Sequence, residues 1–236
     1  MPIDKIIDQY RVLGNPIHQS KSPNIHQAFA AATNQPLNYQ AQLVAEKDFE
    51  HTVRQFFVAG GKGLNITVPF KQRAFAMAQV HSPAAAKAEA ANTLYLNAQA
   101  QLVADNTDGL GLVRDICHNL KGQLNAKRIL VLGAGGAVRG VLQPILAQRP
   151  AQVVIANRTY TKACDLAALF TDLGAIEAIP MAQLQGSFDW IINGTSASLT
   201  GDLPPLPKGL VSNASRCYDM MYGAQTTAFN QWALDQ

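Results

Sequence analysis

The sequence of 236 residues is poor in charge, since Asp, Glu, Lys and Arg together make up 15% of it. An average soluble domain carries roughly 25%. The net charge is only +3, and the basic residues are scattered, so the chain has no charge pattern typical of a nucleic-acid-binding protein. Hydrophobic residues reach 48%, which is enough to build a core and excludes an intrinsically disordered chain.

Long apolar runs and cysteines are also scarce. No uninterrupted apolar stretch of about 18 residues occurs, so no transmembrane helix is expected. Asp4 and Asp8 stand where a secretory signal needs an apolar run, which argues against export. The three cysteines, Cys117, Cys164 and Cys217, fit neither a disulfide framework nor a zinc knuckle. We therefore expect a cytoplasmic protein with reduced thiols, no metal site, no membrane partner and no nucleic-acid partner.

Short apolar runs alternate with helical stretches along nearly the whole chain. In the first half we expect strands over 10–14, 37–44, 63–68, 92–96 and 102–104, and helices over 23–32, 47–58, 70–80 and 83–90. In the second half we expect strands over 128–132, 152–157, 188–193 and near Cys217, and helices over 109–120, 137–147 and 160–170.

This alternation predicts the class of fold. Strands that alternate with helices of about 10–15 residues favour parallel sheets with right-handed crossovers. We predict an α/β protein of two domains. Residues 1–106 would form an α/β substrate-binding and catalytic domain, and residues 107–236 a Rossmann-type dinucleotide-binding domain with a parallel sheet.

A glycine-rich turn lies between the strand expected over 128–132 and the helix after it. Its residues are Gly133, Ala134, Gly135, Gly136 and Ala137. Gly133 and Gly135 fit the first two positions of a dinucleotide fingerprint, which serve the tight turn and the close approach of the backbone to a diphosphate. The third position is Val138 instead of glycine. The following helix offers its N-terminal N–H groups to an anion, so we interpret the segment as a dinucleotide site.

The end of the next strand indicates which dinucleotide is bound. NAD-binding folds place an acid there for the ribose hydroxyl. This chain has Asn157, Arg158 and Thr159, with Lys162 one helical turn further on. A guanidinium and an ammonium attract a 2′-phosphate, which a carboxylate would repel. The sequence therefore predicts NADP(H) as the cofactor.

Three polar segments of the first half are unusual for a purely structural domain. They hold Ser20 and Ser22 before a helix that begins with proline, Asn65, Thr67 and Lys71 around a strand end, and Asn92 with Asp108 in loops. Taken singly, each is compatible with a helix cap, a strand end or a solvated side chain. Together they offer hydroxyls, amides, an ammonium and a carboxylate at strand ends, where α/β proteins gather binding groups. This set suits a small polyhydroxylated acid.

At these segments the sequence resembles the shikimate dehydrogenase family. The matching motifs are GNPIHQSKSP, NITVPFK, ANTLYL, DNTDG, VLGAGGAVRG, NRTYTK, NGTS and YDMMY, in family order from Gly14 to Tyr222. NITVPFK and DNTDG at this spacing are close to diagnostic, whereas many Rossmann proteins share the glycine loop. The resemblance implies an oxidoreductase that reversibly reduces 3-dehydroshikimate to shikimate with NADPH, in the pathway to the aromatic amino acids.

The resemblance also implies roles for the matched residues. Lys71 and Asp108 would be the catalytic pair. The substrate would be held by Ser20, Ser22 and Tyr218 at its carboxylate and by Asn65, Thr67 and Asn92 at its ring hydroxyls. The cofactor would be held by Gly133 to Ala137 at the diphosphate, by Asn157, Arg158, Thr159 and Lys162 at the adenosine phosphate, and by Thr195 near the nicotinamide.

Two positions depart from the family pattern. Gln19 stands where the family usually has a histidine before the serines, and the chain ends at Gln236. The family continues into a helix that carries a substrate-binding glutamine, so we expect this closing segment to be missing.

Other functions were weighed against this one. A quinate/shikimate dehydrogenase that uses NAD is disfavoured by Arg158, and a non-catalytic shikimate-binding module by the retention of Lys71 and Asp108. A generic Rossmann reductase would require the GNPIHQSKSP and NITVPFK matches to be coincidental. The sequence leaves the oligomeric state, monomer or homodimer, open.

Overall fold

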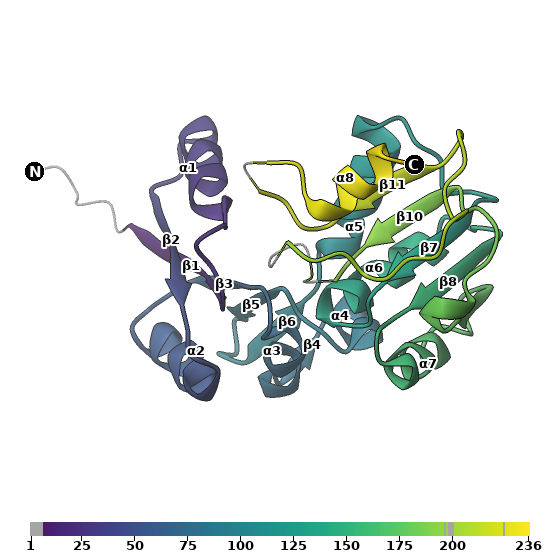
Figure 1. Ribbon diagram of the computed structural model, residues 1–236. Coiled ribbons are helices and arrows are strands. Elements are labelled where there is room, and N and C mark those ends of the chain that lie inside the picture. Colours follow the sequence, from purple (N-terminus) through teal and green to yellow (C-terminus); the bar gives the residue numbers. More distant parts are fainter. Residues whose placement is uncertain (1–6, 196, 198–200, 224) are drawn as a thin grey trace, which may run out of the picture. The chain divides into compact units, whose positions relative to one another are not determined.

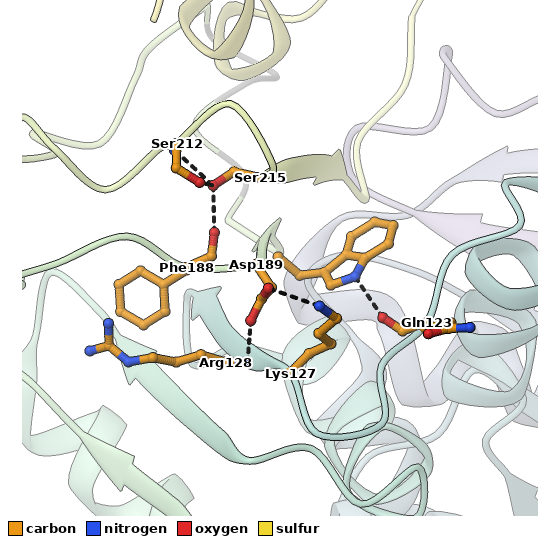
Figure 2. A network of polar contacts seen from close by, with 8 residues as sticks. Gln123, Lys127, Arg128, Phe188, Asp189, Ser212 and Ser215 are labelled. Carbon is orange, nitrogen blue, oxygen red and sulfur yellow. Dashed lines mark hydrogen bonds and ion pairs between the residues drawn. The ribbon is translucent and has the colours of Figure 1, made fainter.

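The computed structural model describes residues 7–195, 197, 201–223 and 225–236. The chain divides into two compact units, Met1–Thr107 and Asp108–Gln236, which we call unit 1 and unit 2 (Figure 1). The division expected from the sequence, between residues 106 and 107, differs from this one by a single residue. Among the described residues, no helix combines the length and the apolar character that crossing a membrane requires.

Unit 1 is built on a six-stranded sheet in the order β2-β1-β3-β5-β6-β4. The strands are β1 (Asp8–Gly14), β2 (Leu37–Leu43), β3 (Gly63–Ile66), β4 (Val80–His81), β5 (Thr93–Leu96) and β6 (Leu102–Asp105). The helices are α1 (Ser22–Thr33), α2 (Phe49–Val58), α3 (Lys71–Met77) and α4 (Pro83–Ala88), with one 3-10 turn over Glu46–Asp48.

This sheet is mixed, so the expectation of parallel sheets was wrong for unit 1. Strand β1 runs parallel to β2 and β3, whereas β5 runs antiparallel to β3 and to β6. The cause is the short connection between β5 and β6, in which the N–H of Asn97 donates to the carbonyl of Gln101. Only antiparallel neighbours can be joined by so short a turn. The helix expected over 70–80 also ends early, because Val80 pairs with β6.

The two faces of the unit 1 sheet bury different side chains, because successive residues of a strand point to opposite faces. On β1, Leu13 joins the core formed with Phe49 of α2 and with Phe70, just before α3. Its neighbour Val12 packs with Tyr39 of β2 on the other face. Figure 1 accordingly shows α1 on one side of this sheet and α2 and α3 on the other.

An aromatic and ionic contact joins α2 to the start of α3. The rings of Phe49 and Phe70 are stacked with centroids 4.4 Å apart, and the Arg73 guanidinium lies over both rings, at 5.2 and 5.6 Å. Arg73 also forms a hydrogen-bonded ion pair with Glu50 of α2. The hydrogen bond from Arg73 holds the pKa of the Glu50 carboxyl below its usual value. The contact fixes the first turn of α3, where Lys71 lies.

Unit 2 is a parallel sheet of five strands in the order β11-β10-β7-β8-β9. The strands are β7 (Arg128–Leu132), β8 (Gln152–Ala156), β9 (Ile176–Ala178), β10 (Trp190–Asn193) and β11 (Arg216–Asp219). The helices are α5 (Asp108–Arg114), continued by a π-helical segment over Asp115–Asn119, α6 (Gly136–Leu146), α7 (Tyr160–Ala168) and α8 (Ala228–Leu234), with a 3-10 turn over Met181–Gln183.

The strand order of unit 2, read from β9 to β11, is the doubly wound 3-2-1-4-5 order. The predicted α/β fold with a Rossmann-type parallel sheet is confirmed. Both faces of the central strand β7 are buried, with Ile129 and Val131 in the core beside α6 and Leu130 and Leu132 in the core closed by Phe229 of α8. Strand β9 and helix α8 were not expected from the sequence.

The three cysteines are free thiols and partly buried. Burial raises the pKa of the Cys217 thiol to about 11. A thiol with so high a pKa stays protonated at neutral pH and is a poor nucleophile.

We expect Leu166→Ala to destabilise unit 2 by about 2–5 kcal/mol, because Leu166 is fully buried on α7 and its loss leaves a cavity. Denaturant unfolding followed by tryptophan fluorescence checks this, since both tryptophans belong to unit 2. The control is Asp165→Ala at the exposed neighbouring position, which should change the free energy of unfolding by about 0.5 kcal/mol or less. Equal effects of the two substitutions would contradict the packing described.

Candidate active site

In unit 2, the glycine-rich turn lies at the carboxyl end of β7, where doubly wound sheets bind their ligands. Gly133 has a φ of +109°, a conformation that residues with a Cβ rarely adopt. Gly135 is the N-cap of α6, and a Cβ placed on it would have no neighbour within 4 Å in the described part of the chain. Open space next to backbone N–H groups at a helix N-terminus is what a diphosphate requires. These residues fit the predicted cofactor.

Val138, which replaces the third glycine of the fingerprint, is fully buried in the core beside α6. The loop after β10 approaches α6 closely at Gly194, because a Cβ placed on Gly194 would lie 2.4 Å from Cγ2 of Val138. A Cβ on Gly133 would likewise lie 3.3 Å from Cγ2 of Thr195. The glycine-rich turn and the loop after β10 are therefore in van der Waals contact, and Thr195 lies beside the expected diphosphate site.

The end of β8 presents the basic residues expected to select the nucleotide. Arg158 and Lys162 are exposed, and within the described part of the chain neither forms an ion pair with an acid. Asn157 shapes the turn, since its Nδ2 donates to the carbonyl of Thr159 at 2.8 Å. Thr159 is the N-cap of α7. Two uncompensated cations beside a helix N-terminus fit the 2′-phosphate of NADP(H).

Ser20 and Ser22 lie between the carboxyl end of β1 and the N-terminus of α1. The backbone N–H of Ser22 donates to Oγ of Ser20 at 3.3 Å, and Ser22 is the first residue of the helix. Both are partly buried. The positive end of α1 and two hydroxyls at one point suit a carboxylate.

Asn65 and Asn92 belong to one hydrogen-bond network. Oδ1 of Asn65 accepts from the hydroxyl of Tyr39 at 2.6 Å, and its Nδ2 donates to the carbonyl of Asn92 at 3.3 Å. Asn92 in turn donates from Nδ2 to Oγ1 of Thr107 at 2.9 Å and accepts the N–H of Thr107 at 3.1 Å. Tyr39, which the sequence did not single out, stacks on His26 with ring centroids 4.2 Å apart.

Thr67 and Lys71 lie on the segment after β3. The N–H of Thr67 donates to the carbonyl of Leu13 at 2.9 Å, and the methyl group of Thr67 occupies the space beside Gly14, where a Cβ would lie only 2.5 Å away. Lys71 is the first residue of α3 and is partly buried. The loops after β1 and β3 are also joined, since the N–H of Asn15 donates to the carbonyl of Val68 at 2.9 Å.

The structure thus brings the expected substrate residues of unit 1 to one edge of its sheet. Strands β1 and β3 end there, and the antiparallel strand β5 begins there, so the three strands deliver Ser20, Lys71 and Asn92 to the same edge. Asn106, in contrast, is 3% exposed and donates to the carbonyl of Ala90 at 2.9 Å. This bond ties the loop after β6 to the segment before β5.

Asp108 is the first residue of α5 and of unit 2 and is partly buried. The next residue, Gly109, lets α5 pack closely on α6, because a Cβ on it would lie 2.4 Å from the carbonyl oxygen of Gly140 and 2.6 Å from Cγ of Pro144. This close packing fixes the start of α5 within unit 2.

Tyr218 packs against the core beside α6, and its hydroxyl donates to Asp115 at 2.9 Å. Burial, and then the hydrogen bond to Asp115, raise the pKa of Tyr218 to about 12. The hydroxyl is engaged inside unit 2, and its substrate-binding role stays a prediction. Tyr222 lies on the loop beyond the carboxyl end of β11 and is 51% exposed. Of the two tyrosines, Tyr222 is therefore the more exposed to solvent at this edge of the sheet.

Three features define the class of this protein. They are a parallel sheet in doubly wound order, a glycine-rich turn at its central strand, and two cations at the end of the neighbouring strand. The chain is a two-domain α/β protein with a Rossmann-type dinucleotide-binding unit. Comparison with known families narrows this class. Residues 12–94 match the family described as the shikimate dehydrogenase substrate binding domain, and residues 115–201 match shikimate / quinate 5-dehydrogenase.

Individual relatives agree with these matches. A shikimate dehydrogenase (NADP(+)) of Cellvibrio japonicus is 56% identical over 97% of this chain and 83% of its own length. The crystal structure of an Ael1 enzyme from Pseudomonas putida is 47% identical, with a TM-score of 0.86 over 97% of this chain and 84% of that one. A shikimate 5-dehydrogenase from Thermus thermophilus, solved with NADP(H) and shikimate, is 27% identical with a TM-score of 0.82, over 97% and 84%. The chain belongs to the shikimate dehydrogenase family.

We expect Gly135→Ala to weaken NADPH binding by about tenfold or more while costing about 1 kcal/mol or less of stability. The new methyl group meets no atom of the described residues within 4 Å, yet it fills the space through which the backbone approaches a diphosphate. Isothermal titration and thermal unfolding measure the two effects. Gly111→Ala, whose Cβ also has no neighbour within 4 Å among the residues that the structure describes, is the matched control and should leave NADPH binding unchanged. Unaltered NADPH binding by Gly135→Ala would contradict the assigned diphosphate site.

Proposed function

We propose that this chain reversibly reduces 3-dehydroshikimate to shikimate with NADPH, as a biosynthetic enzyme of the cytoplasm. The observation that carries the proposal is the convergence of Ser20, Asn65, Thr67, Lys71 and Asn92 at one edge of the unit 1 sheet. This set offers hydroxyls for a carboxylate, amides for ring hydroxyls and an ammonium for a carbonyl oxygen. Membership of the family and the name of the Cellvibrio japonicus relative support the same reaction.

Each substrate group has residues suited to it. We assign the carboxylate to the hydroxyls of Ser20 and Ser22 at the N-terminus of α1, where the helix dipole favours negative charge. We assign the ring hydroxyls to Asn65, Thr67 and Asn92, because amides and hydroxyls both donate and accept hydrogen bonds. Tyr218 is a further candidate for the carboxylate, and in this role its hydroxyl would exchange the bond to Asp115 for one to the substrate.

Lys71 and Asp108 are the proposed catalytic pair. When bound, the reduced nicotinamide supplies the hydride. The negative charge that then develops on the carbonyl oxygen of the substrate needs a cation or a proton donor beside it. The Lys71 ammonium supplies both, since it attracts the charge and transfers a proton to the oxygen. Asp108 orients Lys71 and accepts a hydrogen bond from a substrate hydroxyl.

The cofactor is assigned to unit 2. Gly133, Ala134, Gly135, Gly136 and Ala137 would hold the diphosphate through backbone N–H groups. The 2′-phosphate would be held by Arg158 and Lys162, with Asn157 and Thr159 shaping the turn, and Thr195 would face the nicotinamide. An acid in place of Arg158 would suit NAD, so the NAD-dependent quinate/shikimate alternative is disfavoured.

The reaction is tested by following NADPH oxidation with 3-dehydroshikimate, with 3-dehydroquinate and without substrate. We expect rapid oxidation with 3-dehydroshikimate alone. Oxidation mainly with 3-dehydroquinate would favour the quinate enzyme. Tight binding of shikimate without turnover of either ketone would favour the non-catalytic module.

We expect Lys71→Ala to lower kcat by about 100-fold or more and to change KM for 3-dehydroshikimate much less. The reason is that the ammonium acts mainly on charge that develops in the transition state. Steady-state kinetics separates the two parameters, and Lys62→Ala, at an exposed site before β3, serves as the control. Losses shared equally between kcat and KM would reduce Lys71 to a substrate-positioning residue.

We expect the double variant Arg158→Ala/Lys162→Ala to lose at least tenfold in its preference for NADPH over NADH, mainly through a higher KM for NADPH. Each charge-assisted hydrogen bond to a phosphate is worth about 1.5–3 kcal/mol. The ratio of kcat/KM for the two cofactors measures this preference. Lys208→Ala, at an exposed loop position, should keep the wild-type ratio. A double variant with the wild-type ratio would refute the assigned phosphate site.

A further inference from the structure

Asn193 is one of two polar side chains that are buried among the described residues, and it is 0% exposed. It is the last residue of β10 and stands directly opposite Asp219, the last residue of the parallel neighbour β11. Its Nδ2 donates to Oδ1 of Asp219 at 3.0 Å. Its Oδ1 accepts from both the N–H and the hydroxyl of Thr195, at 3.1 and 2.8 Å.

The chemistry of these groups fixes the direction of every hydrogen bond. The carboxylate oxygen of Asp219 accepts, so Asn193 turns its NH2 group toward Asp219 and its oxygen toward Thr195. The backbone N–H of Thr195 only donates, which requires the same orientation of the amide. The amide oxygen of Asn193 cannot donate a hydrogen bond. The Thr195 hydroxyl must therefore donate its single proton to that oxygen.

This leaves the Thr195 oxygen as a hydrogen-bond acceptor on its remaining lone pairs. Thr195 lies against the glycine-rich turn, since its Cγ2 would be 3.3 Å from a Cβ on Gly133. A group that binds there next to a diphosphate would therefore meet an acceptor. The nicotinamide carboxamide carries an NH2 donor, whereas a ring with only a carbonyl substituent does not.

Asp219 also anchors the loop that leaves β11. Its Oδ1 accepts the N–H of Met221 at 3.0 Å, and its Oδ2 accepts the hydroxyl of Thr227, the N-cap of α8, at 2.6 Å. Three donors from the described residues therefore converge on this carboxylate. One side chain thus holds the end of β10, the start of the loop after β11 and the N-terminus of α8.

We propose that Asp219 and Asn193 are positioning residues that set the Thr195 hydroxyl as the hydrogen-bond acceptor for the carboxamide N–H of the nicotinamide. The inference rests on the proposed NADP site and deepens it. Neither Asp219 nor Asn193 touches the cofactor in this scheme. Their effect reaches it through the polarity imposed on Thr195.

Direct binding tests the proposal without turnover. The affinities of NADPH and of 2′,5′-ADP, which lacks the nicotinamide, are compared by isothermal titration. Thr195→Val keeps the shape and removes the acceptor, and Asp219→Leu keeps a side chain of similar length and removes every acceptor for the Asn193 NH2 group. Each should weaken NADPH by about tenfold, the worth of one hydrogen bond, and change 2′,5′-ADP by less than about twofold. Thr195→Ser should restore wild-type binding.

A second comparison probes the carboxamide itself. The 3-acetylpyridine analogue of NADP+ replaces the amide NH2 by a methyl group, so the wild-type protein should bind it about tenfold more weakly than NADP+. This discrimination should fall to about twofold or less in Thr195→Val and in Asp219→Leu. Thr171→Val is the control, because Thr171 caps α7 through the carbonyl of Ala168 and should keep the wild-type ratio.

Equal weakening of NADPH and 2′,5′-ADP by Asp219→Leu would overturn the proposal and leave the pair a purely structural tie. Unchanged discrimination against the analogue in Thr195→Val would overturn it as well. The proposed function fails in a different way. If the wild-type protein binds NADPH with the expected discrimination and does not reduce 3-dehydroshikimate, the substrate assignment is wrong and the positioning role stands.

Discussion

Parallel strand pairing is the constraint on which the candidate site depends, because it sends the carboxyl ends of neighbouring strands to one edge of a sheet. In unit 2 all five strands obey it, so the glycine-rich turn after β7 and the loop that carries Thr195 after β10 lie in contact. In unit 1 only part of the sheet is parallel, yet β1 and β3 deliver Ser20 and Lys71 to the same edge. The antiparallel strand β5 begins at that edge and therefore adds Asn92 to it.

The low charge content of the chain is reflected in how its polar groups are used. Asn65, Asn92 and Asn193 each join two or more segments through both ends of one amide. An amide carries donors and an acceptor, so it satisfies backbone and hydroxyl partners inside the fold without burying a charge. Where a charge is used, as in Asp219, several donors converge on it. The networks give the candidate binding groups defined directions before any ligand is present.

Most helices and strands were predictable, because their signals are local. Strand β7 is an apolar run that ends in a glycine-rich turn, and α1 has a proline in its first turn, directly after Ser22. Other elements carry no such signal. Strand β4 has two residues and exists only through pairing with β6, and β9 is a three-residue, partly exposed edge strand. The antiparallel direction of β5 depends on which strands it pairs with, and this is not encoded in its own residues.

The sequence by itself determined the chemistry available at the strand ends: the glycine-rich turn, the Arg158 and Lys162 pair that suits a phosphate, and the serines, amides and lysine of the first half. These are properties of residue type and spacing along a single strand and the loop after it. Only the tertiary structure decided which polar atoms meet. Asn193 and Asp219 are 26 residues apart, and Tyr218 and Asp115 are 103 apart. Strand order and side-chain alternation bring such pairs together, and both depend on packing between segments that are distant in the chain.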